Sequence, residues 1–152
     1  MRVLDALHPD AILIDIESRT KREVLEEISR PIARILKVKH EDLIKVLIER
    51  EQMGSTGIGK GIAIPHGRLS GINDLVIGFG LSRKGAQFDS LDGRPVHIFF
   101  ILITPEHSTG LYLKFLARIS RILKNEAVKE KLLHARQLED IISAIKEEDQ
   151  DS

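Results

Sequence analysis

The sequence predicts an α/β fold, a three-layer α/β/α sandwich in which a small mixed sheet is flanked by helices. Apolar residues recur at helical spacing in two segments before residue 54 and in three segments after residue 110, and the apolar runs between them have the length of strands. The run at residues 96–103 is apolar at every position but one, which is typical of a central strand covered on both faces. These observations predict helices packed on both sides of one sheet.

The N-terminal part predicts a strand followed by a helix. Residues 11–16 are short, apolar and β-branched, as in a buried strand. Thr20 and Glu23 match a capping box, so we expect the helix to begin at Thr20 and to continue to about Leu36. Pro31 lies within the helical pattern, and we expect it to kink or split the helix because proline lacks an amide proton.

A second helix is expected from near Glu41 to a stop at Gly54. Arg50 would then lie in its last turn and point into the glycine-rich segment that follows. A cation at the C-terminus of a helix is also favourable by itself, by about 0.3–1 kcal/mol. Both interpretations of Arg50 are open at this point.

Three strand-like segments follow, at residues 62–65, 75–81 and 96–103. Asp92 and Gly93, between the last two, indicate a turn. His97 lies in the expected central strand, where a structural histidine with satisfied hydrogen bonds is the favoured interpretation.

The C-terminal part predicts three helices. Residues 104–108 end the central strand, and residues 111–123 have a helical apolar pattern. Asn125 is suited to cap a short helix, and the last helix is expected at about residues 137–146. The acidic tail, residues 147–152, is expected to be disordered.

Length and composition predict a single domain over residues 1–152, with a core of ordinary size. The formal net charge is zero, so nothing favours nucleic acid or an anionic membrane surface as a partner. The absence of cysteine excludes disulfides, thiolate catalysis and cysteine metal sites. The N-terminus lacks the apolar stretch of a signal peptide and no run approaches about 20 apolar residues, so we expect a cytoplasmic protein without membrane insertion.

The segment at residues 50–68, REQMGSTGIGKGIAIPHGR, is the candidate functional site. Backbone amides in a loop this rich in glycine can converge into an anion-binding nest. Its expected phosphate-binding residues are Ser55, Thr56, Gly57, Gly59 and Gly61. Because Lys60 is followed by Gly61 and not by Ser or Thr, the segment is not a Walker loop, and its glycine spacing does not match a dinucleotide site.

His66 follows this loop and is the candidate reactive residue. Pro65 fixes its own φ and favours an extended Ile64, so the imidazole would be presented from a stiff support. Arg50 and Arg68 place cations on both sides in the sequence. A histidine beside amides, hydroxyls and guanidinium groups suits an imidazole that carries a phosphoryl group. The alternative is an ordinary turn followed by an unreactive histidine.

The pattern ERExxxSTxIGxGIAIPHG at residues 49–67 resembles the enzyme IIA domain of the mannitol/fructose class of the bacterial phosphotransferase system. Within this class it resembles the standalone nitrogen-regulatory IIA proteins, and the likeness extends to LARISRILKNEAVKEKLLHA at residues 116–135. The resemblance implies a phosphotransferase component in which His66 accepts a phosphoryl group and Arg50 holds its oxygens. Ser55 and Thr56 match the paired hydroxyls of the family loop, and they either bond to the phosphate or hold the turn.

The resemblance also implies the partners. Phosphoenolpyruvate phosphorylates enzyme I, which phosphorylates a histidine-containing phosphocarrier protein, which in turn passes the group to IIA. No metal or other cofactor is needed, because the group moves between two imidazoles. The phosphorylated chain would regulate partner proteins, in nitrogen- or potassium-type regulation; alternatively, it is the fructose- or mannitol-specific IIA component that donates to a separate IIB domain.

One position departs from the family pattern. The family usually has a second histidine at the start of the helix after the central strand, and the matching residue here is Tyr112. The hydroxyl of Tyr112 could still donate to the phosphate, but a positive partner would be lost. His107, in the preceding loop, either folds over the same pocket or is an exposed loop residue.

Two further hypotheses come from other classes of protein. The fold type also resembles cytoplasmic domains of anion transporters, which are binding modules without phosphoryl transfer. A metal-dependent hydrolase would have to use His66, His97 and His107, but no pair of them has the helical spacing of metal ligands.

Overall fold

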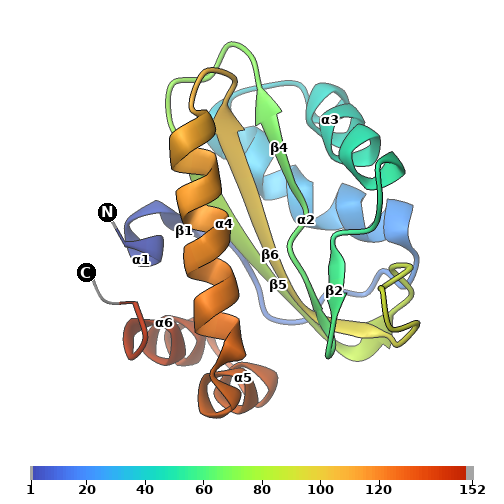
Figure 1. The fold of residues 1–152 in the computed structure, drawn as a ribbon, viewed down its shortest axis with the longest axis vertical. Coiled ribbons are helices and arrows are strands. Elements are labelled where there is room, and N and C mark those ends of the chain that lie inside the picture. Colours follow the sequence, from blue (N-terminus) through green and yellow to red (C-terminus); the bar gives the residue numbers. More distant parts are fainter. Residues whose placement is uncertain (1, 150–152) are drawn as a thin grey trace.

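A computed structural model, in which residues 2–149 are described, has the three-layer α/β/α architecture that the sequence predicts (Figure 1). Its six-stranded sheet has the order β1-β5-β6-β3-β2, and β4 also pairs with β6. The sheet is mixed: β6 is antiparallel to β5 and parallel to β3 and β4. The strands are β1 (Leu7–Leu13), β2 (Gly57–Gly59), β3 (Ile62–Ala63), β4 (His66–Leu69), β5 (Val76–Ala86) and β6 (Val96–Pro105).

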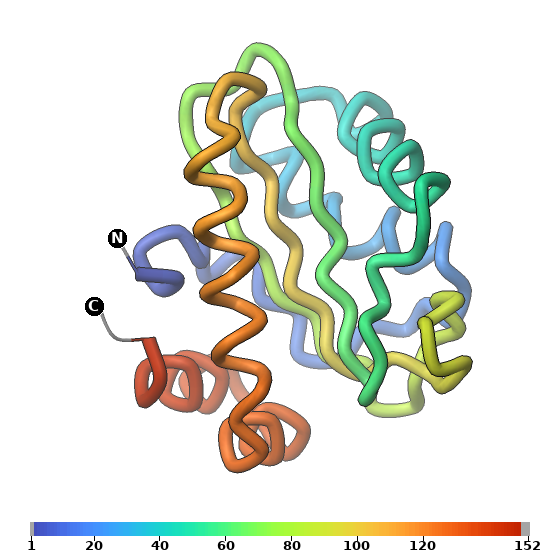
Figure 2. Tube along the Cα trace, in the orientation of Figure 1, coloured from blue at the N-terminus to red at the C-terminus, as the bar shows by residue number. Residues whose placement is uncertain are grey.

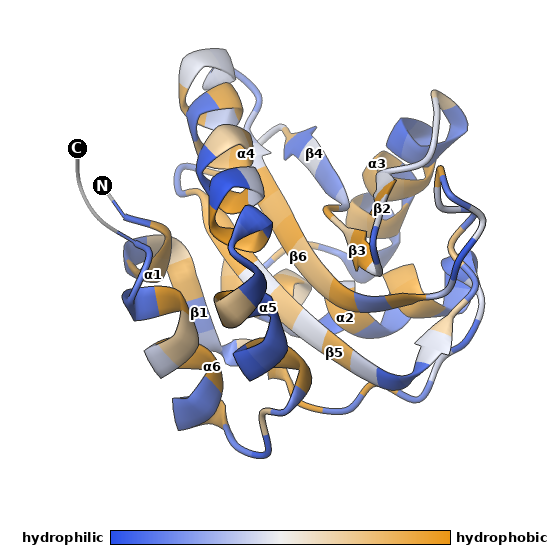
Figure 3. Ribbon diagram, turned by 60° about the horizontal axis from the view of Figure 1, so that its bottom comes forward, coloured by the Kyte–Doolittle hydropathy of each residue, from blue (hydrophilic) through white to orange (hydrophobic). Residues whose placement is uncertain are grey.

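β6 is the central strand, as its composition predicts. Alternate side chains of β6 belong to two separate hydrophobic clusters, with Phe100 and Leu102 on one face and Phe99 and Ile101 on the other. Figure 3 shows this apolar strand between the helices on either side. A strand buried on both faces must be apolar at nearly every position, and this explains its sequence.

The helices cover the two faces unequally. On one face lie α2 (Lys21–Leu36) and α3 (His40–Gln52). The other face is covered by α1 (Val3–Ala6), α4 (Thr109–Lys124), α5 (Glu126–Leu133) and α6 (Leu138–Lys146). Asn125 caps α5 as predicted, because its side-chain oxygen accepts from the amides of Ala127 and Val128. No helix within residues 2–149 combines the length and the hydropathy that crossing a membrane requires.

The beginning of the chain differs from the prediction. α1 was not expected, and the strand predicted at residues 11–16 begins at Leu7 and ends at Leu13. Pro9 concealed this strand, but β1 is at the edge of the sheet, where proline is tolerated.

The first long helix begins where expected, but its cap is different. The side chain of Thr20 accepts no capping bond from the helix amides, and its hydroxyl donates to the Glu23 carboxylate instead. The prediction of a capping box is therefore wrong. Pro31 lies inside α2 without splitting it, since the helix is continuous through Leu36.

The acidic tail is also ordered further than predicted. Asp149 is buried, and its carboxylate accepts hydrogen bonds from the amides of Val3 (2.9 Å) and Leu4 (2.7 Å) at the start of α1. This contact joins the two ends of the described chain, which lie beside each other in Figure 2. The prediction of a disordered tail is wrong for Asp149, and residues 150–152 lie outside the described residues.

The strand expected at residues 62–65 is divided by Pro65. β3 ends at Ala63, and the chain pairs with β6 again from His66, which adds the unexpected strand β4. Proline cannot donate to the ladder, so the regular pairing stops there, although the Pro65 carbonyl still accepts from the Leu102 amide at 3.0 Å. This break places His66 at the start of a fresh strand.

Candidate active site

His66 is half-buried at the first position of β4, opposite Leu102 of the central strand. The next residue, Gly67, faces α3: a Cβ built on Gly67 would lie 2.5 Å from Cγ1 of Val46. Only a residue without a side chain allows this close approach. The sequence GIAIPHG therefore sets both the support of the imidazole and its distance from α3.

The hydrogen bonds of His66 define its tautomer. Nδ1 lies 2.6 Å from the carbonyl oxygen of Ile64, which can only accept, so Nδ1 carries the proton. Nε2 accepts from Nε of Arg50 at 3.2 Å, so its lone pair faces the guanidinium group. Pro65, which lies between Ile64 and His66 in the chain, keeps the Ile64 carbonyl within reach of the His66 ring. The result is a neutral imidazole with Nε2 as its nucleophilic atom.

The pKa of His66 is lowered below its ordinary value of 6.5, chiefly because burial disfavours the charged imidazolium. The Arg50 guanidinium lowers it further, while the hydrogen bond to Ile64 and the Glu51 carboxylate act in the opposite direction. Neutral His66 is therefore the dominant form at pH 7.

Arg50 lies in the last turn of α3, as predicted, and points toward the following loop. Besides the bond to His66, its Nη1 donates to the Gly54 carbonyl at 2.9 Å. The guanidinium thus connects the end of the helix, the loop and the imidazole. Its place is explained by these contacts and not only by a favourable interaction with the helix dipole.

The glycine-rich segment contains a β-hairpin. β2 and β3 pair antiparallel, with Lys60 and Gly61 at the turn in left-handed conformations. Its amides are bonded within the protein: that of Gly57 to Ser55 Oγ at 3.0 Å, and that of Lys60 to Asp92 at 2.9 Å. These two amides are therefore taken by protein acceptors, and the binding of an anion by the rest of the loop stays a prediction.

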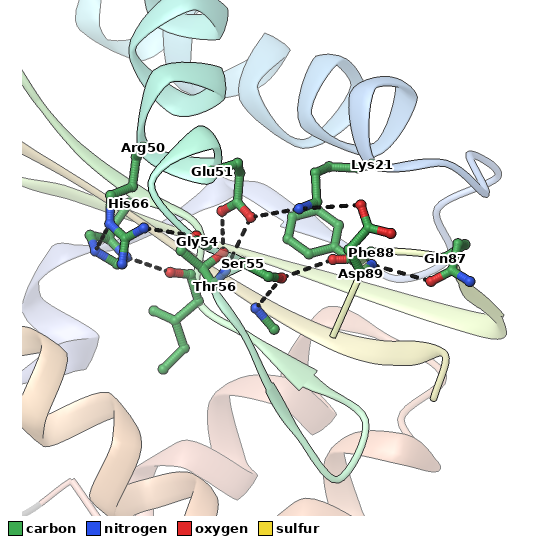
Figure 4. A network of polar contacts seen from close by, with 12 residues as sticks. Lys21, Arg50, Glu51, Gly54, Ser55, Thr56, His66, Gln87, Phe88 and Asp89 are labelled. Atoms are coloured by element: carbon green, nitrogen blue, oxygen red, sulfur yellow. Dashed lines mark hydrogen bonds and ion pairs between the residues drawn. The ribbon is translucent and has the colours of Figure 1, made fainter. Parts of the chain in front are cut away.

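Ser55 and Thr56 hold the loop in this structure. Ser55 Oγ donates to the Phe88 carbonyl at 2.9 Å, and Thr56 is buried with its hydroxyl donating to the Glu51 carboxylate. Glu51 also accepts from the Thr56 amide at 3.0 Å and pairs with Lys21 of α2 at 3.2 Å. Figure 4 shows this network extending from Arg50 and His66 to Lys21 and Asp89.

Sequence reasoning missed Glu51, although a signal was present. A carboxylate in the last turn of a helix is opposed by the helix dipole, so a buried acid there requires specific partners. Glu51 has 4% of its side chain exposed and obtains those partners from Thr56 and Lys21. Glu51 therefore fixes the same loop that Arg50 contacts through Gly54.

On the α4 side, Tyr112 contacts the imidazole directly. The ring centroids of Tyr112 and His66 lie 5.3 Å apart, with the planes tilted by 58°. Arg68 of β4 lies over the Tyr112 ring, with its Cζ 5.7 Å from the ring centroid. The Nη1 of Arg68 also donates to Thr109 Oγ1 at 3.0 Å. Arg50, His66, Tyr112 and Arg68 thus form one continuous cluster.

Within residues 2–149 neither His107 nor His97 makes a hydrogen bond or ring contact with the residues of this cluster. His107 is exposed in the turn between β6 and α4, and the aromatic neighbour of His66 is Tyr112. His97 is bonded through Nδ1 to the Ser82 carbonyl at 2.8 Å, the satisfied structural histidine that we predicted. Within residues 2–149 no group of three or more His, Asp or Glu side chains is placed to hold a metal ion.

Comparison with known proteins gives concordant results. The family model described as "Phosphoenolpyruvate-dependent sugar phosphotransferase system, EIIA 2" matches residues 5–148. A nitrogen regulatory protein of Bradyrhizobium diazoefficiens is 33% identical over 145 residues, which cover 95% of both chains. The fructose-specific EIIABC component of Bacillus subtilis is 34% identical over 150 residues, 98% of this chain but 24% of that protein.

A solved structure agrees with these matches. The nitrogen regulatory protein IIA-Ntr of Neisseria meningitidis has a TM-score of 0.88 and 33% sequence identity, with 93% of this chain and 97% of that one covered.

Proposed function

The chain belongs to the EIIA type-2 family of the phosphoenolpyruvate-dependent sugar phosphotransferase system, a family of phosphocarriers, and from this premise we propose that His66 accepts the phosphoryl group. The donor is a histidine-containing phosphocarrier protein. The observation that carries the proposal is the pair of hydrogen bonds on the imidazole, which leaves Nε2 as a neutral nucleophile next to a guanidinium group.

In the transfer step, the Nε2 lone pair of His66 forms a bond to phosphorus. The N–P bond of the donor breaks, and its electron pair returns to the donor imidazole. His66 loses no proton, because Nδ1–H stays bonded to the Ile64 carbonyl. The positive charge that develops on the ring is stabilised by that carbonyl and by the Glu51 carboxylate, which both favour the charged imidazole.

Arg50 changes its hydrogen-bond acceptor during this step. In the resting protein the Nε of Arg50 donates to the lone pair of His66 Nε2. The guanidinium group must therefore turn from Nε2 to the phosphoryl oxygens as the new bond forms. There it offsets the negative charge of the transferred group. Its Nη1 remains bonded to Gly54, which keeps the guanidinium beside the reacting atoms while Nε changes its acceptor.

The test is phosphorylation in a reconstituted system. The protein is incubated with phosphoenolpyruvate, enzyme I and the phosphocarrier protein, and its intact mass is followed over time. We expect the gain of one acid-labile phosphoryl group in the wild type and none in His66→Ala. No gain in the wild type, with a donor system that phosphorylates another IIA protein, would contradict the proposal and favour a binding module.

For the output we propose regulation of partner proteins by phosphorylation state. The support is similarity: the nitrogen regulatory relative is 33% identical over 145 residues, and the solved IIA-Ntr structure covers 93% of this chain with a TM-score of 0.88. Fructose-specific donation to IIB is the second candidate because of the 34% identity to the fructose-specific EIIABC component. Mixing the phosphorylated protein with a fructose-type IIB domain separates the two, since only a sugar-specific component transfers its phosphoryl group quantitatively.

A further inference from the structure

We propose that Arg68 and Tyr112 hold the phosphoryl group together with Arg50, so that phosphorylated His66 lies within reach of two guanidinium groups. This inference rests on the proposed function of His66. It assigns a role to Arg68, a strand residue two positions after the histidine. Arg68 would supply a second positive partner at the site, where the sequence led us to expect that Tyr112 leaves none.

The Arg68 side chain is held in place although it is exposed to solvent. Its Nη1 donates to the Thr109 hydroxyl at 3.0 Å, and its Cζ lies 5.7 Å from the centroid of the Tyr112 ring. Both contacts come from the first turn of α4, so they fix the guanidinium between β4 and α4. Contacts with a hydroxyl and an aromatic face leave the charge of an arginine intact.

Arg68 has no carboxylate partner within residues 2–149, unlike Lys21 and Arg22, which pair with acids. Its remaining donors are therefore available for an anion. A positioned guanidinium whose charge is not neutralised, next to a nucleophilic imidazole, has the properties of a phosphate-binding group.

Tyr112 joins the two arginines. Its ring contacts both His66 and Arg68. Burial raises the pKa of the Tyr112 hydroxyl, so it stays protonated near neutral pH, while the charges of Arg50 and Arg68 both act on it in the opposite direction. Arg68 lies over the Tyr112 ring, and Arg50 donates to His66, the imidazole that Tyr112 contacts. Within residues 2–149 the hydroxyl makes no hydrogen bond, which leaves it free to donate to a phosphoryl oxygen.

The charge of the ligand explains why two arginines are required. A phosphoryl group on a side chain carries about −1.5 to −2 charges near pH 7. Arg50 supplies one positive charge, and one of its donors is held by Gly54. Arg68 supplies the second charge from β4, the strand that also bears His66, so the pair can stabilise the transferred group from two directions.

The experiment measures the rate at which the intact protein gains a phosphoryl group from enzyme I and the phosphocarrier protein. Arg68→Gln is expected to slow this rate on the order of 10-fold to 100-fold, because a preorganised donor to the transferred group is lost. Arg68→Lys keeps the charge but not the planar fork, so it should retain more activity than Arg68→Gln. Tyr112→Phe keeps the ring beneath Arg68 and should slow the rate less than Arg68→Gln.

The matched control is Arg136→Gln, which removes the same charge from an exposed position between α5 and α6. It should be phosphorylated at the wild-type rate. If Arg68→Gln also reacts like the wild type, the role of Arg68 is refuted while the role of His66 stands. If the wild type gains no phosphoryl group, the proposed function itself fails.

A second measurement tests Arg68 without phosphoryl transfer. Inorganic phosphate is titrated into the unphosphorylated protein, and the ring nitrogen signals of His66 are followed by NMR. We expect weaker phosphate binding in Arg68→Gln than in the wild type and in Arg136→Gln. Equal affinities in all three proteins, or no response of His66 to phosphate at all, would overturn the proposal.

Discussion

At the scale of single residues, the reactivity that we propose for His66 depends on two neighbours of opposite charge on the same helical turn. Arg50 lowers the pKa of the imidazole and Glu51 raises it, while burial gives the largest lowering. Arg50→Gln should therefore raise the pKa of His66, and Glu51→Gln should lower it further. A pH titration of the His66 ring signals by NMR measures both shifts.

The control for these shifts is Arg136→Gln, which should leave the titration of His66 unchanged. The two site variants should move the pKa in opposite directions from the wild type. A shift of the same sign in both would show that the surrounding loop had rearranged, and it would contradict the electrostatic roles given to the two side chains.

The sequence predicts the candidate site residues better than their chemical state. His66 and Arg50 follow from the glycine-rich pattern and its resemblance to a known family. The tautomer depends on the Ile64 carbonyl, whose direction is fixed only once Pro65 has broken the strand. The contact of Arg68 with Tyr112 joins residues 44 positions apart, so no local pattern reveals it.

At the scale of secondary structure, the site depends on how closely β4 approaches α3. A Cβ on Gly67 would lie 2.5 Å from Val46 Cγ1, so Gly67→Ala must push apart the helix that carries Arg50 and the strand that carries His66. We expect a loss of about 1–3 kcal/mol in the free energy of unfolding, as for other overpacked positions, together with slower phosphorylation. Urea denaturation and the mass assay measure the two effects.

The companion variant is Gly67→Ala combined with Val46→Ala, which restores space at the same contact. It should recover part of both losses relative to Gly67→Ala alone. Failure of the double variant to recover either quantity would place the cause outside this contact.

The loop after α3 is held by a buried carboxylate. Thr56→Val removes the hydroxyl that donates to Glu51 and leaves that buried acid with one partner fewer. The expected cost is about 1–3 kcal/mol in the free energy of unfolding, measured by urea denaturation. Thr56→Ser keeps the hydroxyl and should be much closer to the wild type. Equal losses in both variants would indicate that the methyl group, not the hydrogen bond, is what matters.

Most elements could be predicted from their patterns, and the errors have identifiable causes. The long helices and the central strand could be predicted from the spacing of their apolar residues, because those residues are the ones that pack in the core. The hairpin of β2 and β3 was missed because its strands are too short to show alternation. Its turn uses Lys60 with φ of 57°, a conformation that is uncommon for a residue other than glycine.

At the scale of the whole molecule, two histidines make the stability depend on pH. The pKa values of His40 and His66 are lowered from 6.5 in the folded protein, in both cases chiefly by burial. Below about pH 6.5 the unfolded chain therefore binds protons that the folded protein does not, and acidification favours unfolding. The Tm should fall as the pH decreases from 6.5 through the folded-state pKa values.

The variant His40→Gln/His66→Gln removes this contribution and should show a flatter dependence of Tm on pH between about 5 and 7. Thermal unfolding followed by circular dichroism measures it. If the double variant and the wild type lose stability in parallel over this range, other groups must be responsible for the acid sensitivity.

The three-layer arrangement could be predicted as a whole because one strand, β6, is apolar on both of its faces. The alternating side chains of β6 divide between the two cores, so an apolar run of this kind requires cover on both faces. The way in which the ends of the chain meet could not be predicted. Asp149 appears as one more acid in a polar tail, and its burial depends on the amides of α1, which the sequence did not reveal as a helix.

The measurement that tests the central claim most directly locates the phosphoryl group on the imidazole. The protein is labelled with ¹⁵N at histidine and phosphorylated through enzyme I and the phosphocarrier, and ³¹P–¹⁵N couplings then identify the bonded nitrogen. Because Nδ1–H is bonded to Ile64 and the Nε2 lone pair faces Arg50, the account predicts phosphorylation at Nε2 of His66. A phosphoryl group on Nδ1, or on another histidine, would contradict it.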